Sequence, residues 1–416
     1  MKRLRPAILS LLLLITLAMS SGSLAAQDTV ANSAAPFRFR LASWETRALL
    51  ESGAAQLRRQ FQPSLGLRAE DTELVKRYFT LAQQANMLRE ELGKAAATRQ
   101  DASGIEQQLA ALEHQQGILE SAVERTIAVQ LTQALRQEGL GRGPRRRILF
   151  PPVLFKLDPL PALLAVSPRE RIELKESHLL QPGLLILARE RVEGQQARLG
   201  LSSLVTDIGG LATYPSQVPN SFGLDFALAT VAHEWLHQYL AFQSLGKGYF
   251  AGGEMTSLNE TVAALFGDEL GARLYYELYG GPPPTPSHRE AGAAAKPEPG
   301  AFDFTREMRQ TRLRAEELLG EGRVAEAEAY MEERRQLFLA QGYYLRKLNQ
   351  AYFAFHGSYA EGPASISPLG RQVRLIRERS SGLGDFVHTV ERFGRFEEFQ
   401  AYLRAQGLAP AGATGP

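Results

Sequence analysis

The pentapeptide His233-Glu234-Trp235-Leu236-His237 constrains the fold of this chain more than any other segment. Residues four positions apart lie on one face of an α-helix, so the two imidazoles can bind one metal ion if the segment is helical. Glu234 is then turned toward the same side, where a carboxylate can accept a proton from a metal-activated water. Residues 226–241 contain neither Gly nor Pro, and Asp225 is a suitable N-cap. The segment therefore predicts a metal-binding helix with its own general base. The alternative is an ordinary helix that carries two histidines by chance.

Two histidines do not complete a catalytic zinc site, which usually takes three ligands from the protein. The next acid in a suitable context is Glu260, within a second helix expected to run from Ser257 to about Tyr279. Ser257 and Glu260 also match a capping box, in which the glutamate would bind the helix N-terminus and no metal. Both roles remain open at this stage, and the other ligand candidates are Glu254, Asp268 and Glu269.

In these residues the chain resembles the gluzincin metallopeptidases, the zinc peptidases of the thermolysin and aminopeptidase type. In that group a His-Glu-x-x-His helix is followed by a helix bearing Asn-Glu, here Asn259-Glu260. The resemblance covers Asp225 to about Leu274, and it implies one Zn²⁺ per chain, bound by His233, His237 and Glu260, with Glu234 as catalytic base. The separation of 23 positions between His237 and Glu260 is slightly longer than is usual in thermolysin-like enzymes. A glycine-containing loop over residues 243–256 is expected to absorb the difference.

Further residues are assigned supporting roles. Asn259 and Asp268 are expected to lie behind the ligands, with Asp268 orienting a histidine through its free ring N–H. Peptide hydrolysis also needs a donor that stabilises the oxyanion of the tetrahedral intermediate. His356 and Tyr359, at the end of a predicted helix, are the candidates for that donor, ahead of Tyr279 and His388.

The N-terminus predicts export. Lys2, Arg3 and Arg5 precede an apolar run over residues 7–19 and a small-residue segment ending at Ala26, the order of a secretory signal peptide. We therefore expect residues 1–26 to be removed and the protein to be secreted or to lie in the periplasm or cell envelope. It would be membrane-anchored if the signal stays uncleaved. No other apolar run is long enough to span a bilayer.

The composition limits the classes of molecule that this chain is expected to bind. A net charge of +2 argues against nucleic acid, and the absence of cysteine excludes disulfides and thiolate ligands. The expected partner is a peptide or protein substrate, and the sequence leaves the oligomeric state open.

The rest of the chain divides into three further regions. Residues 27–147 are expected to form a flexible lead and a helical hairpin, with apolar residues at helical spacing over 70–97 and 105–123. The basic run 141–147 is expected to be a linker, with a pro-segment cleavage site as the alternative.

Residues 148–300 are expected to hold a small mixed sheet and the zinc-binding core. The apolar runs that predict strands are 148–150, 153–157, 162–166, 172–174, 183–187 and 204–205. Residues 211–215 are a candidate edge strand for substrate, and 280–300 a surface loop.

Residues 301–416 are expected to form helices that complete the cleft. The predicted fold class is therefore α+β and predominantly helical: a helical hairpin, a small sheet, metallopeptidase-like site helices and a helical C-terminal part.

These observations predict a secreted zinc-dependent peptidase. The alternatives are a non-catalytic metal-binding or structural envelope protein with the same fold, and a metal-dependent hydrolase of a non-peptide amide or ester.

Overall fold

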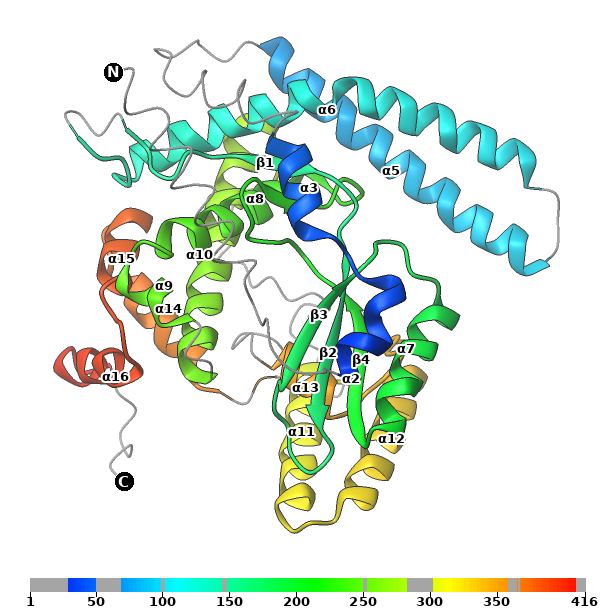
Figure 1. Ribbon diagram of the computed structural model, residues 1–416. Helices are drawn as coiled ribbons and strands as arrows, with labels where there is room; N and C mark the ends of the chain where they lie inside the picture. The colour runs from blue at the N-terminus through cyan, green and yellow to red at the C-terminus, as the bar shows by residue number, and fades with distance from the viewer. Residues whose placement is uncertain are drawn as a thin grey trace.

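The computed structural model describes residues 29–49, 69–98, 102–143, 148–249, 253–282, 302–357, 365 and 367–408. The described chain is mostly helical with a small amount of strand, which confirms the predominantly helical α+β class (Figure 1). The predicted signal peptide and residues 144–147 of the basic run lie outside the described residues.

The predicted helical hairpin is present and longer than expected. Helix α5 (Ala69–Thr98) packs along α6 (Ser103–Gln137), which continues past the predicted end near Val123 because Ile127, Leu131 and Leu135 extend its buried face. The Gln116 amide donates a hydrogen bond to the carbonyl of Asn220, 2.9 Å away. The hairpin therefore supports the turn that leads into the next long helix.

Two long helices cross at the centre of the larger hydrophobic core. Helix α8 (Leu224–Leu240) contains the pentapeptide, and α10 (Gly253–Tyr279) packs closely along it. The contact is backbone to backbone, since a Cβ on Gly267 would lie 2.6 Å from Ala229 O and one on Gly271 would lie 2.5 Å from Ala229 Cα. Helix α8 begins at Leu224 after an N-cap at Gly223, so the prediction of Asp225 as the cap was wrong by two positions.

The β structure consists of two separate pieces and not of one mixed sheet. Strands β2 (Ala162–Pro168), β3 (Glu176–Leu180) and β4 (Leu201–Asp207) form an antiparallel sheet in the order β3-β2-β4. Strand β1 (Phe155–Leu157) pairs in parallel with β5 (Ser216–Val218), with Phe155 opposite Ser216. Strand β5 leads directly into the turn before α8.

Three of the predicted strands were wrong. Residues 183–187 lead into helix α7 (Ile186–Arg198), because the apolar run is followed by helix-forming residues that bury Val192 and Gln196 on one face. Residues 172–174 are a loop whose Ile172 packs against the helices of the C-terminal region. Ile148 forms only an isolated bridge with Arg142.

The flexible lead expected at the start of this region is also wrong for residues 29–42, which are largely helical. Helix α2 (Thr29–Ala34) and the 3₁₀ turn η1 (Ala35–Phe37) pack on the sheet, with Val30 buried against its core. Helix α3 (Leu41–Ala48) follows, and its Trp44 is buried and donates from Nε1 to Asp158 Oδ2 at 2.6 Å. Burial of these side chains orders a segment whose composition alone suggests no structure.

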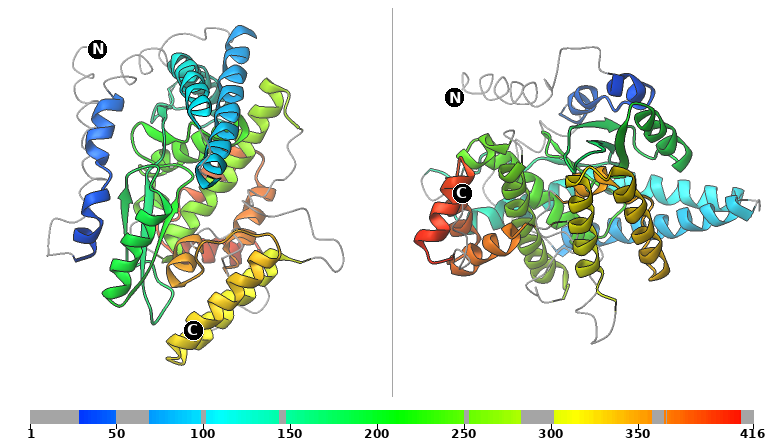
Figure 2. Two further views of the ribbon diagram at one scale, coloured as in Figure 1. Left: turned by 90° about the vertical axis from the view of Figure 1, so that its right-hand side faces the viewer. Right: turned by 90° about the horizontal axis from the view of Figure 1, so that it is seen from below.

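The C-terminal helices pack in two places, on the three-stranded sheet and in the core around α10. Helix α13 (Gln350–His356) packs on β2 and β4, and it extends the layer formed by α11 (Phe304–Gly320) and α12 (Val324–Ala340). Figure 2 shows these helices on the face of the sheet opposite α2 and α7. Helices α14 (Leu369–Arg379), α15 (Leu383–Val390) and α16 (Phe396–Ala405) instead join the core around α10.

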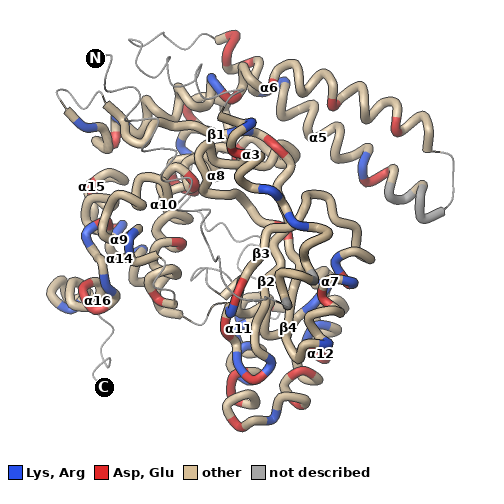
Figure 3. Tube along the Cα trace, in the orientation of Figure 1, with Lys and Arg blue, Asp and Glu red and all other residues tan. Residues whose placement is uncertain are grey.

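Lys and Arg alternate with Asp and Glu along most of the described helices, as Figure 3 shows. Within the described ranges, no helix has both the length and the apolar character that a membrane span requires.

Candidate metal centre

The two histidines of the pentapeptide point to one place. His233 Nε2 and His237 Nε2 are 3.0 Å apart, and the two rings meet edge to face with centroids 4.7 Å apart. Both side chains are largely buried. The four-residue spacing on α8 therefore brings the two Nε2 atoms together, as the sequence predicted.

Glu260 supplies a third donor atom from α10. Its Oε2 lies 3.7 Å from His233 Nε2 and 3.5 Å from His237 Nε2. Ligands at 2.0–2.1 Å from a tetrahedral zinc ion are separated by about 3.3 Å from one another. The three donor atoms therefore form a triangle of the size that one zinc ion needs, and two imidazoles with a carboxylate are a donor set that zinc accepts.

The capping alternative for Glu260 is wrong. Helix α10 begins at Gly253, so Ser257 lies in its second turn, where the Ser257 carbonyl accepts a hydrogen bond from Thr261 Oγ1. Glu260 is 7% exposed and faces the histidines. The other ligand candidates do not converge in the same way, since Glu254 is exposed in the first turn and Glu269 pairs with Arg377 of α14.

Asn259 orients His237. Its Oδ1 lies 2.7 Å from His237 Nδ1. An amide oxygen can only accept a hydrogen bond, so Nδ1 of the neutral ring carries the proton and Nε2 keeps its lone pair for a metal. Asn259 therefore has the supporting position that the sequence predicted.

Asp268 is buried next to Gly267, whose Cα approaches His233 so closely that a Cβ there would lie 2.9 Å from His233 Cβ. The aspartate is thus held at the turn of α10 that faces His233. Its assigned role as an orienting residue remains a prediction.

Glu234 lies beside the same group. One carboxylate oxygen of Glu234 and one nitrogen from each histidine fall within 4.8 Å of one another. The side chain is 5% exposed, and its carboxylate rests against the backbone of Gly210. A Cβ on Gly210 would lie 2.1 Å from Glu234 Oε1 and 2.8 Å from Thr230 Cγ2. Only glycine leaves room for the carboxylate here, and no pattern in the sequence indicated this contact.

The protonation states of Glu260 and His237 are coupled. Burial has the largest single effect and would lower the pKa of His237, but the charge and hydrogen bond of Glu260, with the contributions of Glu234 and Asn259, together raise that pKa to about 9. Burial would raise the pKa of Glu260, but His237 and His233 hold it well below its usual range. The Glu260 carboxylate is therefore ionised, and its negative charge can balance either a protonated His237 or a bound metal ion.

Of the residues assigned to oxyanion stabilisation, those that the structure describes contact other residues, and that role remains a prediction. The His356 ring packs against Tyr352 and Phe355 at the end of α13, and burial lowers its pKa to about 4. Tyr359 lies outside the described residues. Tyr279 is buried at the end of α10 and donates to Gln130, while His388 lies against Glu391.

Tyr249 is a member of the site that the sequence did not single out. Its hydroxyl donates to Glu260 Oε1 over 2.8 Å, and its ring lies 6.0 Å from that of His237. It belongs to the glycine-containing loop, in which the short helix α9 (Ser244–Lys247) interrupts residues 243–256. A single tyrosine in a loop without periodicity carries no signal that sequence reasoning could use.

The candidate substrate strand is not a strand over its predicted length. Leu211 forms an isolated antiparallel bridge with Gln217, and the chain then turns through a cis peptide at Pro215 into β5. The Gln238 side chain of α8 donates to Thr213 O and to Ser216 Oγ. The segment is therefore attached to the metal-binding helix, although it offers no continuous edge.

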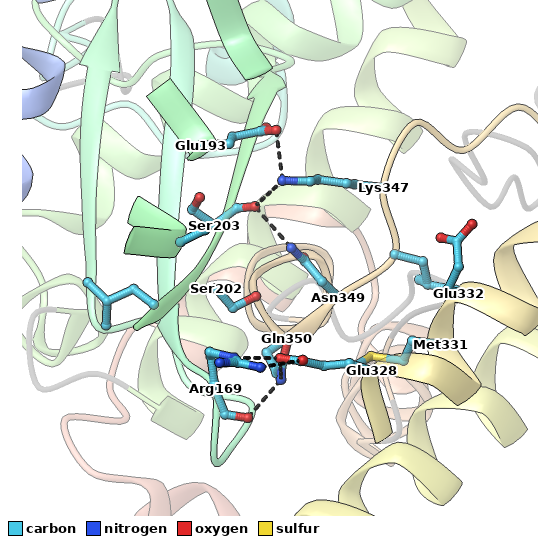
Figure 4. Close-up of a pocket in the computed structure, with 13 residues that line it drawn as sticks. Arg169, Glu193, Ser202, Ser203, Glu328, Met331, Glu332, Lys347, Asn349 and Gln350 are labelled. Atoms are coloured by element: carbon cyan, nitrogen blue, oxygen red, sulfur yellow. Dashed lines mark hydrogen bonds and ion pairs between the residues drawn. The ribbon is translucent and has the colours of Figure 1, made fainter. Parts of the chain in front are cut away.

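A cavity of about 440 Å³ lies elsewhere, between β4, α7, α12 and the segment before α13 (Figure 4). It is lined by paired charges, including Arg169 with Glu328 and Lys347 with Glu193. None of the site residues lines it. The cavity is separate from the chemistry described above.

Comparison with protein families, curated proteins and solved structures found no match to this chain. The function of the His233–His237–Glu260 group is therefore inferred from its geometry.

Proposed function

We propose that this chain is an exported zinc-dependent peptidase, with His233, His237 and Glu260 as the metal ligands and Glu234 as the general base. The observation that carries the proposal is the triangle of donor atoms, with sides of 3.0, 3.5 and 3.7 Å, beside a buried carboxylate. A helix that carried two histidines by chance would have no reason to bury a third donor from a separate helix against both of them.

A bound Zn²⁺ would supply a Lewis acid that polarises the scissile carbonyl and lowers the pKa of the attacking water. The chain's own residues do the rest. His233 and His237 present Nε2 lone pairs, and Asn259 keeps the ring of His237 in the required orientation. Glu234 accepts a proton from the water during attack and returns it to the departing amine. Gly210 leaves the space that this carboxylate occupies.

The first test is metal content together with cleavage of a peptide library by the purified chain without residues 1–26. We expect about one zinc per chain and cleavage that a chelator abolishes. Glu234→Gln is the matched control, because it should keep the zinc and lose about 10²- to 10⁴-fold in kcat. The cleavage products also distinguish an endopeptidase from an aminopeptidase.

The alternatives give different results. Stoichiometric zinc without cleavage of any peptide would favour a non-catalytic metal-binding protein. Turnover restricted to small esters or non-peptide amides would favour the third class. A chain that takes up no metal when supplied with zinc would overturn the site itself.

A further inference from the structure

The two oxygens of the Glu260 carboxylate have separate partners. Oε2 faces the histidine nitrogens at 3.5 and 3.7 Å, whereas Oε1 accepts the hydrogen bond from the Tyr249 hydroxyl at 2.8 Å. A hydrogen bond to one carboxylate oxygen and not to the other favours a fixed orientation of the carboxylate.

The loop that carries Tyr249 is itself anchored to α10 and to the segment at the end of α15. The carbonyl of Tyr249 accepts from Thr256 Oγ1 at 2.7 Å, which ties it to the first turn of α10. Upstream, the Leu245 amide donates to the Glu391 carbonyl at 3.1 Å, and Gly248 approaches Met255 and the Gly394 carbonyl so closely that a Cβ would collide with the Met255 side chain. These contacts fix the position of the loop and so place the Tyr249 hydroxyl beside Glu260.

We propose that Tyr249 is a positioning residue that holds Glu260 as a one-oxygen metal ligand. The proposal rests on the metal site proposed above. A zinc ion with two imidazoles and one carboxylate oxygen keeps a fourth position open for water and substrate. If both carboxylate oxygens turned toward the metal, they would occupy that position. By engaging Oε1, the Tyr249 hydroxyl keeps the second oxygen away from the ion.

The test is Tyr249→Phe, which removes one hydroxyl and keeps the ring beside His237. Zinc affinity is measured by competition with a chromophoric chelator, and coordination is read from the visible absorption of the Co²⁺-loaded protein. We expect zinc affinity to fall by about 10- to 100-fold, as is usual when a partner of a metal ligand is lost. We also expect the Co²⁺ bands to weaken, because a two-oxygen carboxylate raises the coordination number above four.

Two controls separate positioning from a general effect on the fold. Tyr239→Phe removes a phenol from α8 whose hydroxyl bonds to Glu391, and it should leave zinc affinity and the Co²⁺ spectrum unchanged. In a Glu260→Ala background, Tyr249→Phe should cause no further loss of zinc affinity, because its effect passes through Glu260.

The outcomes distinguish this inference from the proposed function. If the wild type binds zinc and Tyr249→Phe matches it in affinity and Co²⁺ spectrum, the positioning role is wrong and the peptidase proposal stands. An equal loss in the Glu260→Ala background would also overturn the positioning role. If wild type and His237→Ala alike bind no zinc, the metal site fails and this inference fails with it.

Discussion

Gly210→Ala offers the sharpest test of the role of Glu234, because the change lies far from every proposed metal ligand in the sequence. A Cβ at position 210 would lie 2.1 Å from Glu234 Oε1, well inside any permitted contact. Relief of this overlap requires the carboxylate to retreat by about 1 Å, and a displacement of that size at a reacting group costs about 10²-fold in rate. The Gly210 backbone is not in the left-handed region, so alanine brings no backbone strain of its own.

We therefore expect Gly210→Ala to lower kcat on a cleaved peptide by about 100-fold while zinc content stays at the wild-type level. Gly209→Ala is the matched control, because a Cβ there would make only an ordinary contact, 3.7 Å from Phe226 Cζ. Rates are measured well below the unfolding temperature of each variant, since overpacking can also destabilise by about 1–3 kcal/mol. A kcat for Gly210→Ala close to that of Gly209→Ala would refute the reasoning.

Two further predictions concern the metal. Glu260→Ala should bind zinc measurably but more weakly than the wild type while the fold persists, whereas Ser257→Ala should keep wild-type affinity, because Ser257 lies inside α10 and caps nothing. Chelator competition and circular dichroism check both, and wild-type zinc affinity in Glu260→Ala would contradict the assignment. Zinc affinity should rise with pH up to about 9, because the pKa of metal-free His237 is about 9 and its proton must leave before Nε2 can bind. Calorimetry at pH 7 in two buffers of different ionisation enthalpy should then count about one proton released per zinc, and no buffer dependence would argue against His237 as a ligand.

The parts of the site that the sequence predicted are those fixed by helical geometry. His233 and His237 converge because four positions make about one turn, and this relation depends on local spacing alone. The contact of Asn259 with His237 joins two helices, and it was predicted from the family resemblance and not from spacing.

The remaining contacts arise from tertiary packing. Gly210 and Glu234 meet across a loop after β4, and Tyr249 reaches Glu260 through a loop without regular periodicity. Neither contact leaves a pattern along the chain. The apolar run 183–187 illustrates a second limit, because a short apolar run fits a buried strand and the start of a helix equally well.

The crossing of α8 and α10 has a consequence for the metal site. Gly267 and Gly271 let the main chains of the two helices touch at Ala229, so the gap across which the donors face one another is set by backbone contact. A larger residue at either glycine would push the two helices apart near His233. Core substitutions that spare these two positions leave this backbone contact in place, so the spacing of the helices beside the donors depends on two small residues that bind no metal.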